Sequence, residues 1–243
     1  MTVDICIHEF EILDSTNRLL MDMAKDGAPC GTVVWAHRQS SGRGRLGRSF
    51  SSPEGGVYVS LLLPLPTGSK DAGFYLTAMA GVAVKRTISQ VCNVNCGIKW
   101  VNDVILNGKK VCGILAQGCN DKVIMGIGVN YTTAISEFPP ELRDIACSIY
   151  DDPSKAPEMS LFVNALAKNL FEISEGDDES WLEEYKSSST IVGNEVQIIQ
   201  AGKVVGKGKA VSIDDLCHLH ILGDDGKETV LSTGEVSIRK SHD

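Results

Sequence analysis

Several features that mark particular protein classes are missing from this 243-residue sequence. No apolar run approaches the roughly 20 residues that a membrane-spanning helix needs. The N-terminal MTVDICIHEFEIL has neither the basic start nor the apolar block of a signal peptide. No CxxC occurs among the eight cysteines, so no structural zinc site is expected. These absences predict a cytoplasmic protein without a membrane segment, whose cysteines are reduced and partly buried thiols.

Basic residues are also scarce, with 23 Lys and Arg against 31 Asp and Glu. The net charge of −8 argues against a general nucleic-acid-binding surface, which is normally basic. Hydrophobic residues make up 43% of the chain, as in an ordinary globular protein. A chain of this length can form one sizeable core, or a large domain with a small one attached.

Hydrophobic periodicity predicts that the first part of the chain is α+β. A helix is expected to begin after a cap at Asp14 or Ser15 and to end near Gly27. Asn107-Gly108 predicts a type I′ hairpin turn. Further helices are expected at residues 72–91 and 159–173. Strands are expected at residues 3–13, 32–37, 57–63, 98–100, 104–106, 111–116 and 123–129.

The C-terminal part has a different pattern. Residues 172–184 carry seven carboxylates and no Lys or Arg, which indicates a solvated helix face, or less simply an acidic docking surface. Three serines at 187–189 look like a linker. Short strands are then expected at residues 196–200, 204–213, 216–222 and 229–232. The sequence therefore predicts an α+β domain over residues 1–188, followed by a small β-barrel domain over residues 189–243.

Half of the eight arginines in the chain fall within eleven residues, in a glycine-rich stretch without acidic residues. They are Arg38, Arg43, Arg45 and Arg48. Such a concentration of like charge is tolerated most easily when an anion lies among the arginines. Guanidinium groups suit phosphate, and the glycines let backbone N–H groups come close to it. The stretch predicts a phosphate-binding loop that becomes ordered when its ligand binds, and the alternative is an exposed basic loop without a ligand.

Known glycine-loop motifs do not account for this stretch. Gly42, Gly44 and Gly47 match GxGxxG, but the dinucleotide fingerprint requires a helix to begin at the third glycine. Here a polar segment with Pro53 follows, and then a strand. The chain also lacks GxxxxGK[ST], and it lacks the other segments of protein kinases.

A second basic group surrounds the predicted hairpin. Lys99 ends one strand in the segment KWVND, and Lys109-Lys110 follows the Asn107-Gly108 turn. If these strands pair, Lys99 and Lys110 lie close together. A lysine there can neutralise a carboxylate and a phosphate that must approach each other, as acyl-adenylate formation requires. Asp103 is a candidate either to orient that lysine or to hold Mg²⁺. Taken singly, each lysine is more simply a solvated surface residue, but that interpretation weakens when both flank a hairpin next to the arginine loop.

Together these segments resemble the biotin–protein ligase family. The resemblance covers nearly the whole chain and is carried by four strings: DSTN at 14–17, QSSGRGRLGR at 39–48, KWVND at 99–103 with KVCGIL at 110–115, and GIGVN at 126–130. It implies a catalytic domain like that of class II aminoacyl-tRNA synthetases and biotin ligases, with a mixed sheet and flanking helices. It also implies a C-terminal SH3-like β-barrel.

The resemblance implies an ATP-dependent biotin–protein ligase. Such an enzyme activates biotin as biotinyl-5′-AMP and transfers it to a lysine of a biotin carboxyl carrier protein or domain. Biotin, ATP and Mg²⁺ are the expected ligands. Lys110, Arg43 and Arg45 are the implied catalytic residues. The implied biotin-binding residues are Ser15, Thr16, Asn17, Gln39, Gly42, Arg43, Gly44, Arg45, Trp100, Lys110, Gly113 and Ile114. The implied ATP-binding residues are Arg43, Arg45, Arg48, Phe50, Asn102, Asp103, Lys110, Asn130 and Arg239, with Asp103 as the metal ligand.

Two positions depart from the family pattern, because Val101 stands where Pro is common and Phe50 where Trp is common. Some family members carry an N-terminal DNA-binding domain. The first expected strand begins near Val3, so we expect the short form of the family without specific DNA binding. The resemblance allows a monomer or a homodimer. The alternatives are a lipoate–protein ligase, which would share the fold and the adenylate chemistry, and a non-catalytic biotin or nucleotide sensor.

Overall fold

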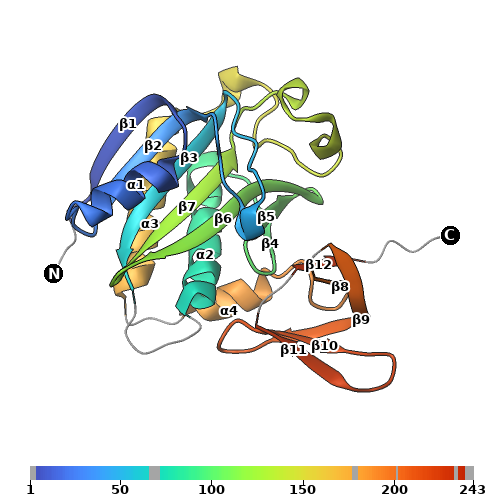
Figure 1. Ribbon diagram of the computed structural model, residues 1–243. Helices are drawn as coiled ribbons and strands as arrows, with labels where there is room; N and C mark the ends of the chain where they lie inside the picture. The colour runs from blue at the N-terminus through green and yellow to red at the C-terminus, as the bar shows by residue number, and fades with distance from the viewer. Residues whose placement is uncertain (1–3, 66–71, 177–179, 201, 233–234, 239–243) are drawn as a thin grey trace.

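A seven-stranded mixed sheet forms the centre of the computed structural model, which describes residues 4–65, 72–176, 180–200, 202–232 and 235–238 (Figure 1). Its strand order is β1-β2-β3-β7-β6-β5-β4. The strands are β1 Cys6–Leu13, β2 Thr32–Gln39, β3 Gly56–Pro64, β4 Gly97–Lys99, β5 Asp103–Leu106, β6 Lys109–Cys119 and β7 Lys122–Asn130. Strand β1 runs parallel to β2, and the other neighbouring pairs are antiparallel.

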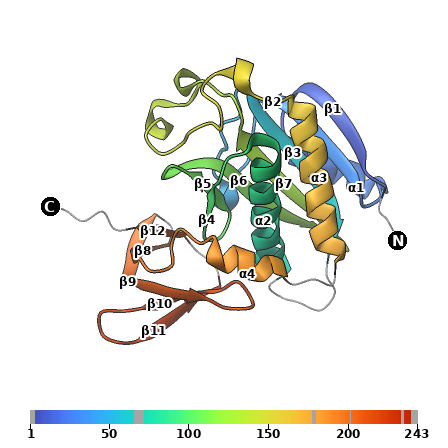
Figure 2. The ribbon, with the colours of Figure 1, turned by 180° about the vertical axis from the view of Figure 1, so that it is seen from behind.

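Helices cover both faces of this sheet (Figures 1 and 2). Helix α1, Thr16–Lys25, covers one face, and helices α2, Ala72–Cys92, and α3, Met159–Glu175, cover the other. Val34 and Leu62 pack with Leu20 of α1, whereas Val33 and Leu61 belong to the larger core under α2 and α3. Strands β2 and β3 are thus buried on both faces, which explains their continuous apolar runs. The predicted α+β architecture is confirmed.

Local signals in the first part of the sequence behave as expected. Ser15 occupies the N-cap position of α1, although its side chain makes no capping hydrogen bond. Gly27 has a φ of 96° just after the helix, a conformation that glycine adopts without strain. Asn107 and Gly108 have φ values of 50° and 78°, as a type I′ turn between β5 and β6 requires. Short 3₁₀ turns occur at Arg45–Gly47, Ile135–Glu137, Pro140–Leu142 and Pro153–Lys155.

The C-terminal part forms a second, antiparallel sheet of five strands in the order β11-β10-β9-β8-β12. The strands are β8 Glu195–Gln200, β9 Lys203–Ile213, β10 Leu219–Leu222, β11 Glu228–Leu231 and β12 Glu235–Ile238. The predicted start of β10 at residue 216 is wrong. Asp214 and Cys217 form a turn there, with Cys217 at a φ of 64°.

Helix α4, Ser180–Ser187, leads from the first sheet to the second. The serines that follow it are not a free linker. The Ile98 N–H donates to Ser188 O at 2.8 Å, and the Thr190 N–H donates to Ile98 O at 2.9 Å. These bonds hold residues 188–190 alongside β4, where Ile98 and Ser189 form a parallel β-bridge. Backbone pairing therefore holds the segment that leads into the C-terminal sheet beside β4, next to KWVND.

The acidic stretch around α4 is only partly the solvated face that its composition predicts. Glu183 is exposed, but the Glu184 carboxylate bonds to Lys85 and Arg86 of α2 at 3.0 and 2.8 Å. Burial alone would raise the pKa of Glu184, but the hydrogen bonds from Arg86 and Lys85 hold it below its ordinary value. Residues 177–179 of this stretch lie outside the described residues. Within the described part of the chain, no helix is long and apolar enough to cross a membrane.

Candidate active site

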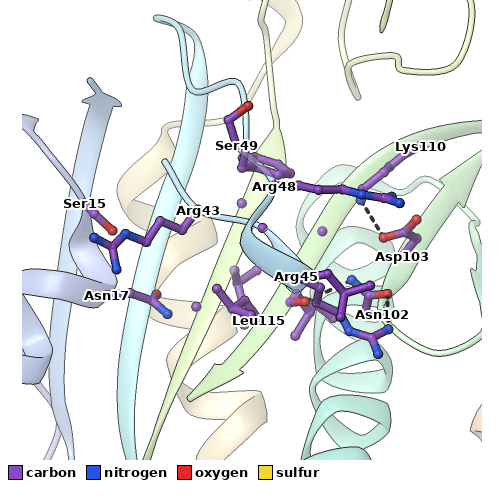
Figure 3. A pocket seen from close by; sticks show the side chains of 18 of the residues that line it. Ser15, Asn17, Arg43, Arg45, Arg48, Ser49, Asn102, Asp103, Lys110 and Leu115 are labelled. Atoms are coloured by element: carbon purple, nitrogen blue, oxygen red, sulfur yellow. Dashed lines mark hydrogen bonds and ion pairs between the residues drawn. The ribbon is translucent and has the colours of Figure 1, made fainter. Parts of the chain in front are cut away.

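A cavity of about 160 Å³ opens where the N-terminus of α1, the arginine loop and strands β4 to β7 meet (Figure 3). The structure brings together here most of the residues that the sequence singled out. These are Ser15, Thr16, Asn17, Gln39, Arg43, Gly44, Arg45, Arg48, Phe50, Trp100, Asn102, Asp103, Lys110, Gly113 and Ile114. Three expected residues are not among those lining it: Gly42 and Asn130 lie beside it, and Arg239 is outside the described residues.

The arginine loop is a short hairpin over this cavity. The Gly44 N–H donates to Arg48 O at 2.7 Å, and the Phe50 N–H donates to Gly42 O at 2.9 Å. A Cβ on Gly42 would lie 2.4 Å from Phe50 O, so only glycine fits there. Arg48 is in an extended conformation after Gly47, and no helix begins at this point. The exclusion of a dinucleotide fingerprint is therefore confirmed.

Arg45 connects the loop to the opposite wall. Its guanidinium donates to Asn102 Oδ1 at 3.1 Å and lies over the Phe74 ring, with 5.7 Å between Cζ and the ring centroid. Contacts of this kind hold a guanidinium in a fixed direction, from which its positive charge attracts an anion. Arg43 points from the loop toward Ser15 and Asn17 (Figure 3). The loop thus directs Arg43 and Arg45 toward different walls of one cavity.

One end of the cavity is a polar network around the start of α1. Gln39 Oε1 accepts from the Thr16 N–H at 2.8 Å. Ser60 donates to Asn17 Oδ1 at 2.6 Å, and the Asn17 amide donates to Gln117 Oε1 at 2.7 Å. Such a network fixes the direction of each donor and acceptor, which suits a small polar ring that both donates and accepts hydrogen bonds.

Sequence reasoning missed Ser60 and Gln117. Ser60 is fully buried in the run VYVSLLL of β3. A polar residue inside a continuous apolar strand was the signal that could have found it, because buried polar groups are hydrogen-bonded. Gln117 offered no comparable signal, since it is a polar residue in the partly buried end of β6. Its contact with Asn17 joins positions 100 residues apart.

Glycines in β6 and β7 make the wall of the cavity flat. Gly113 and Gly128 face each other across the two strands. A Cβ on either would lie 2.8 or 2.4 Å from the Phe50 ring. A Cβ on Gly126 would lie 2.0 Å from Asn17 Oδ1. The glycines of GIGVN and KVCGIL thus make room for the side chains of Phe50 and Asn17.

The other end of the cavity is cationic. Lys110 Nζ lies 2.6 Å from Asp103 Oδ1 and 5.8 Å from the centre of the Phe50 ring. The dashed line in Figure 3 marks the ion pair. Lys99 also lines the cavity, as expected from strand pairing. An anionic ligand that enters here meets Lys110 and Lys99, with Arg48 of the loop nearby, so two anions can be held side by side (Figure 3).

Asn130 supports Lys110 from behind. Its amide nitrogen donates to Cys147 O at 3.0 Å and lies 3.4 Å from Lys110 O. The backbone of the Ala146 segment also bridges to Lys110. Because the amide nitrogen is occupied, the carbonyl oxygen is the Asn130 atom suited to a ligand. Asn130 thus joins the backbone of Lys110 to that of Cys147, a contact that its motif did not reveal.

Cys112 is the thiol beside the Lys110–Asp103 pair, and it is fully buried. Burial raises its pKa far above the ordinary value, although Lys110 opposes the shift. The thiol is therefore protonated, and a protonated thiol is a poor nucleophile. All eight cysteines are free thiols, as expected, and five of them are buried. Within the described residues no group of three His, Cys, Asp or Glu side chains forms a metal centre.

Comparisons with known proteins agree with this geometry. Residues 9–130 match the model of the "Biotin/lipoate A/B protein ligase family", and residues 191–239 match the "Biotin protein ligase C terminal domain". The biotin–[acetyl-CoA-carboxylase] ligase of Mycobacterium tuberculosis is 31% identical over 234 residues, which cover 91% of this chain and 85% of that protein. The chain belongs to the biotin/lipoate A/B protein ligase family.

Other members of this ligase family resemble the chain over different extents. The bifunctional ligase/repressor BirA of Bacillus subtilis is 41% identical over 145 residues, but the match spans only 44% of that protein. The structure of the biotin protein ligase from Aquifex aeolicus in complex with biotin and ATP is 30% identical, with a TM-score of 0.80. That match covers 97% of this chain and 99% of the Aquifex chain. The family's architecture therefore extends over both sheets of this chain.

Proposed function

We propose that this chain is a biotin–protein ligase: it activates biotin with Mg·ATP to biotinyl-5′-AMP and transfers the biotin to a lysine of a biotin carboxyl carrier domain. The observation that carries the proposal is one cavity with a polar network at one end, Lys110 and Lys99 at the other, and the loop arginines beside it. A biotin ring needs directed donors and acceptors, whereas its carboxylate and the ATP phosphates need cations. The names of the Mycobacterium and Aquifex relatives support biotin and ATP as the substrates.

The polar end is proposed to bind the biotin ring. Thr16, Asn17 and Gln39 would hydrogen-bond the ureido group, with Ser15 beside them at the helix start. Trp100 and Ile114 would pack against the sulfur ring, and Gly113 next to Ile114 would border it. Gly42 shapes the arginine hairpin, so that Arg43, Gly44 and Arg45 close over the biotin carboxylate. The hydrogen bonds from Thr16 to Gln39 and from Ser60 to Thr16 and Asn17 support this proposal, because they fix these groups before a ligand arrives.

The cationic end is proposed to bind ATP. Phe50 would stack on the adenine, and its place on the flat glycine wall supports this role. The Asn102 side chain and the side-chain oxygen Oδ1 of Asn130 would face the nucleotide. Arg48 would hold the triphosphate, together with Arg43 and Arg45. Arg239 remains a proposal from the sequence motif alone.

The first step is an in-line displacement. A biotin carboxylate oxygen attacks the α-phosphorus of ATP, the bond from that phosphorus to the bridging β-phosphate oxygen breaks, and pyrophosphate leaves. Both reactants are anions, so the barrier depends on neutralising charge between them. We assign that task to Lys110, whose ammonium is held by Asp103 at 2.6 Å. Arg43 and Arg45 add positive charge from the loop.

The second step transfers the acyl group. The neutral amine of a carrier lysine attacks the carbonyl carbon of the mixed anhydride, the carbon–oxygen bond to AMP breaks, and the nitrogen loses a proton. No side chain of the ligase forms a covalent intermediate in this scheme. The protonated state of the buried Cys112 thiol agrees with that.

Magnesium is expected to accompany ATP. Mg²⁺ typically takes one or two carboxylates and keeps phosphate and water ligands. Asp103 is the only carboxylate among the described residues that line the cavity, so the residues fit a metal bound chiefly by the phosphates. When bound, Mg²⁺ would neutralise part of the triphosphate charge.

The domain bounds, the location, the oligomeric state and the partner are also proposals. We propose a catalytic domain over residues 1–188 and a C-terminal domain over residues 189–243. We also propose a cytoplasmic protein, monomeric or homodimeric, whose partner is the carrier domain. The separate five-stranded sheet that begins at Glu195 supports the division.

The experiment that tests the function follows the mass of a carrier domain after incubation with ATP and either biotin or lipoate. A mass gain of one biotin, with none for lipoate, is the expected result. A gain with lipoate alone would instead support a lipoate–protein ligase. Binding of biotin without any mass gain or pyrophosphate would support a non-catalytic sensor.

A further inference from the structure

The KWVND segment supplies Lys99, Trp100, Asn102 and Asp103 to the cavity, yet the C-terminal third of the chain holds this segment in place. The backbone at Ile98 pairs with Ser188 and Thr190. The Tyr185 hydroxyl of α4 donates to Val101 O at 3.4 Å. A further hydrogen bond joins Trp100 to the second sheet itself.

Trp100 joins the cavity to the C-terminal sheet. Its side chain is buried, and the indole Nε1–H donates to Cys217 O at 2.8 Å. The ring centroid lies 6.0 Å from that of Phe74, the ring that also carries Arg45. A buried indole N–H without a partner is costly, so the Cys217 carbonyl determines where the ring can lie. Val236 of β12 lines the same cavity.

The Cys217 carbonyl is aimed by a tight turn between β9 and β10, and Asp214 organises that turn. Asp214 Oδ1 accepts the N–H groups of Leu216 and His218 at 3.0 and 2.8 Å. The Asp214 carbonyl accepts the Cys217 N–H at 3.0 Å. Cys217 has a left-handed φ of 64°, which a non-glycine residue holds only when its surroundings fix it.

The other carboxylate oxygen of Asp214 faces two histidines. Oδ2 lies 3.2 Å from His218 Nδ1 and 3.3 Å from His220 Nε2. His220 also bonds to Glu228 of β11. Asp214 therefore accepts hydrogen bonds from the turn through Oδ1 and contacts His218 and His220 through Oδ2.

We infer that Asp214 is a positioning residue for the substrate cavity: it shapes the β9–β10 turn so that the Cys217 carbonyl holds Trp100 against the site. The C-terminal sheet then contributes to substrate binding without supplying a side chain that reacts. The effect on biotin rests on the function proposed above, whereas the effect on Trp100 does not.

Two substitutions at Asp214 separate the turn from the charge. Asp214→Ala removes both oxygens. Asp214→Asn keeps one oxygen that can accept the Leu216 and His218 N–H groups. It loses the negative charge and places an NH2 group where Oδ2 faced the two histidines. Asp225→Asn is the matched control, because Asp225 Oδ1 accepts the Lys227 N–H at 3.1 Å in the other hairpin of this sheet, away from Trp100.

Protein labelled with 5-fluorotryptophan gives one fluorine resonance for each of the three tryptophans, assigned by single Trp→Phe replacements. In Asp214→Ala the Trp100 resonance should shift, while those of Trp35 and Trp181 stay in place and report an intact fold. The KM for biotin should rise about three- to tenfold, the range for one lost hydrogen bond, with kcat little changed. Asp214→Asn and Asp225→Asn should keep the wild-type spectrum and KM.

A Trp100 resonance that stays in place in Asp214→Ala, or that moves equally in Asp225→Asn, overturns the inference. So does a shifted resonance with an unchanged KM. If the proposed function fails, the wild-type protein releases no biotin-dependent pyrophosphate. The fluorine spectra still decide whether Asp214 positions Trp100.

Discussion

Lys110 and Asp103 form an ion pair across the β5–β6 hairpin, with 2.6 Å between Nζ and Oδ1. Both side chains are partly buried, at 33% and 21% exposure. The bulge between Val104 and Ile105 sets the register that brings them together. An arriving carboxylate and phosphate therefore meet an ammonium that already points into the cavity. Such preorganisation is the main catalytic resource of a reaction without a protein nucleophile.

Lys110→Ala should lower adenylation by about 100-fold or more, because the variant loses the charge that stabilises the transition state. Biotin should still bind, since the polar network around Asn17 is untouched. Pyrophosphate release and isothermal calorimetry measure the two effects. Lys109→Ala is the control, because the Lys109 ammonium donates to Arg143 O outside the cavity. Unchanged adenylation in Lys110→Ala would remove Lys110 from the mechanism.

Asp103→Asn should lower kcat about ten- to 100-fold, because an unanchored lysine spends less time in the productive position. The variant should bind biotin normally. Pyrophosphate release measured across a magnesium titration checks the cause. A defect that persists at saturating Mg²⁺ agrees with a role in orienting Lys110. Full recovery at high Mg²⁺ would mean that Asp103 acts as a metal ligand instead.

Substitutions of two glycines of β7 should affect the KM values for biotin and ATP separately. Gly126→Ala places a methyl group against Asn17, and Gly128→Ala places one against Phe50. Gly126→Ala should raise the KM for biotin about tenfold, and Gly128→Ala should raise the KM for ATP about tenfold. Each substitution should also lower the free energy of unfolding by about 1–3 kcal/mol. Gly118→Ala in β6 is the control, because no atom lies within 4 Å of its added Cβ. Equal effects of both changes on both substrates would contradict the proposed division of the cavity.

The contacts of Glu184 with Lys85 and Arg86 make part of the stability depend on pH. The pKa of this carboxyl is lowered in the folded state, so its contribution is full above the ordinary value near 4.5 and is lost as the pH falls through the lowered one. Glu184→Gln should therefore destabilise the fold at pH 7 by about 1 kcal/mol or less after solvent screening. Urea unfolding should show this difference shrinking at acidic pH. A difference that grows on acidification would have the wrong sign, and the exposed Glu183→Gln is the control.

The arginine loop should become less accessible when the cavity is filled. Trypsin can cut after Arg43, Arg45 or Arg48, and a ligand that these side chains bind would hold the hairpin closed. Cleavage in this loop should slow when biotin and ATP are added together. Cleavage at the same rate with and without ligands would contradict the predicted ordering.

The sequence predicted most of the elements because their signals are local. The apolar runs of β2 and β3, the type I′ turn at Asn107-Gly108 and the stop at Gly27 each depend on neighbouring residues. The strand that was expected to begin at residue 216 begins later, because Asp214 bonds forward to His218 and turns the chain. That competition between side chain and strand is hard to see in a pattern of apolar residues.

The candidate site was predicted unevenly for a similar reason. Motifs identified the residues of the arginine loop and of KWVND, and pairing of the strands brings them together. The partners that orient these residues come from distant positions: Ser60 for Asn17, Phe74 for Arg45 and Cys217 for Trp100. Periodicity indicates that Ser60 and Cys217 are buried, but it does not indicate which residues they contact.

Pyrophosphate release from ATP, with biotin and lipoate as parallel acyl substrates and no carrier present, tests the central claim most directly. Release that requires biotin and is nearly abolished in Lys110→Ala is the predicted result. Release that requires lipoate, or none with either acid, would contradict the assignment of this cavity to biotin adenylation.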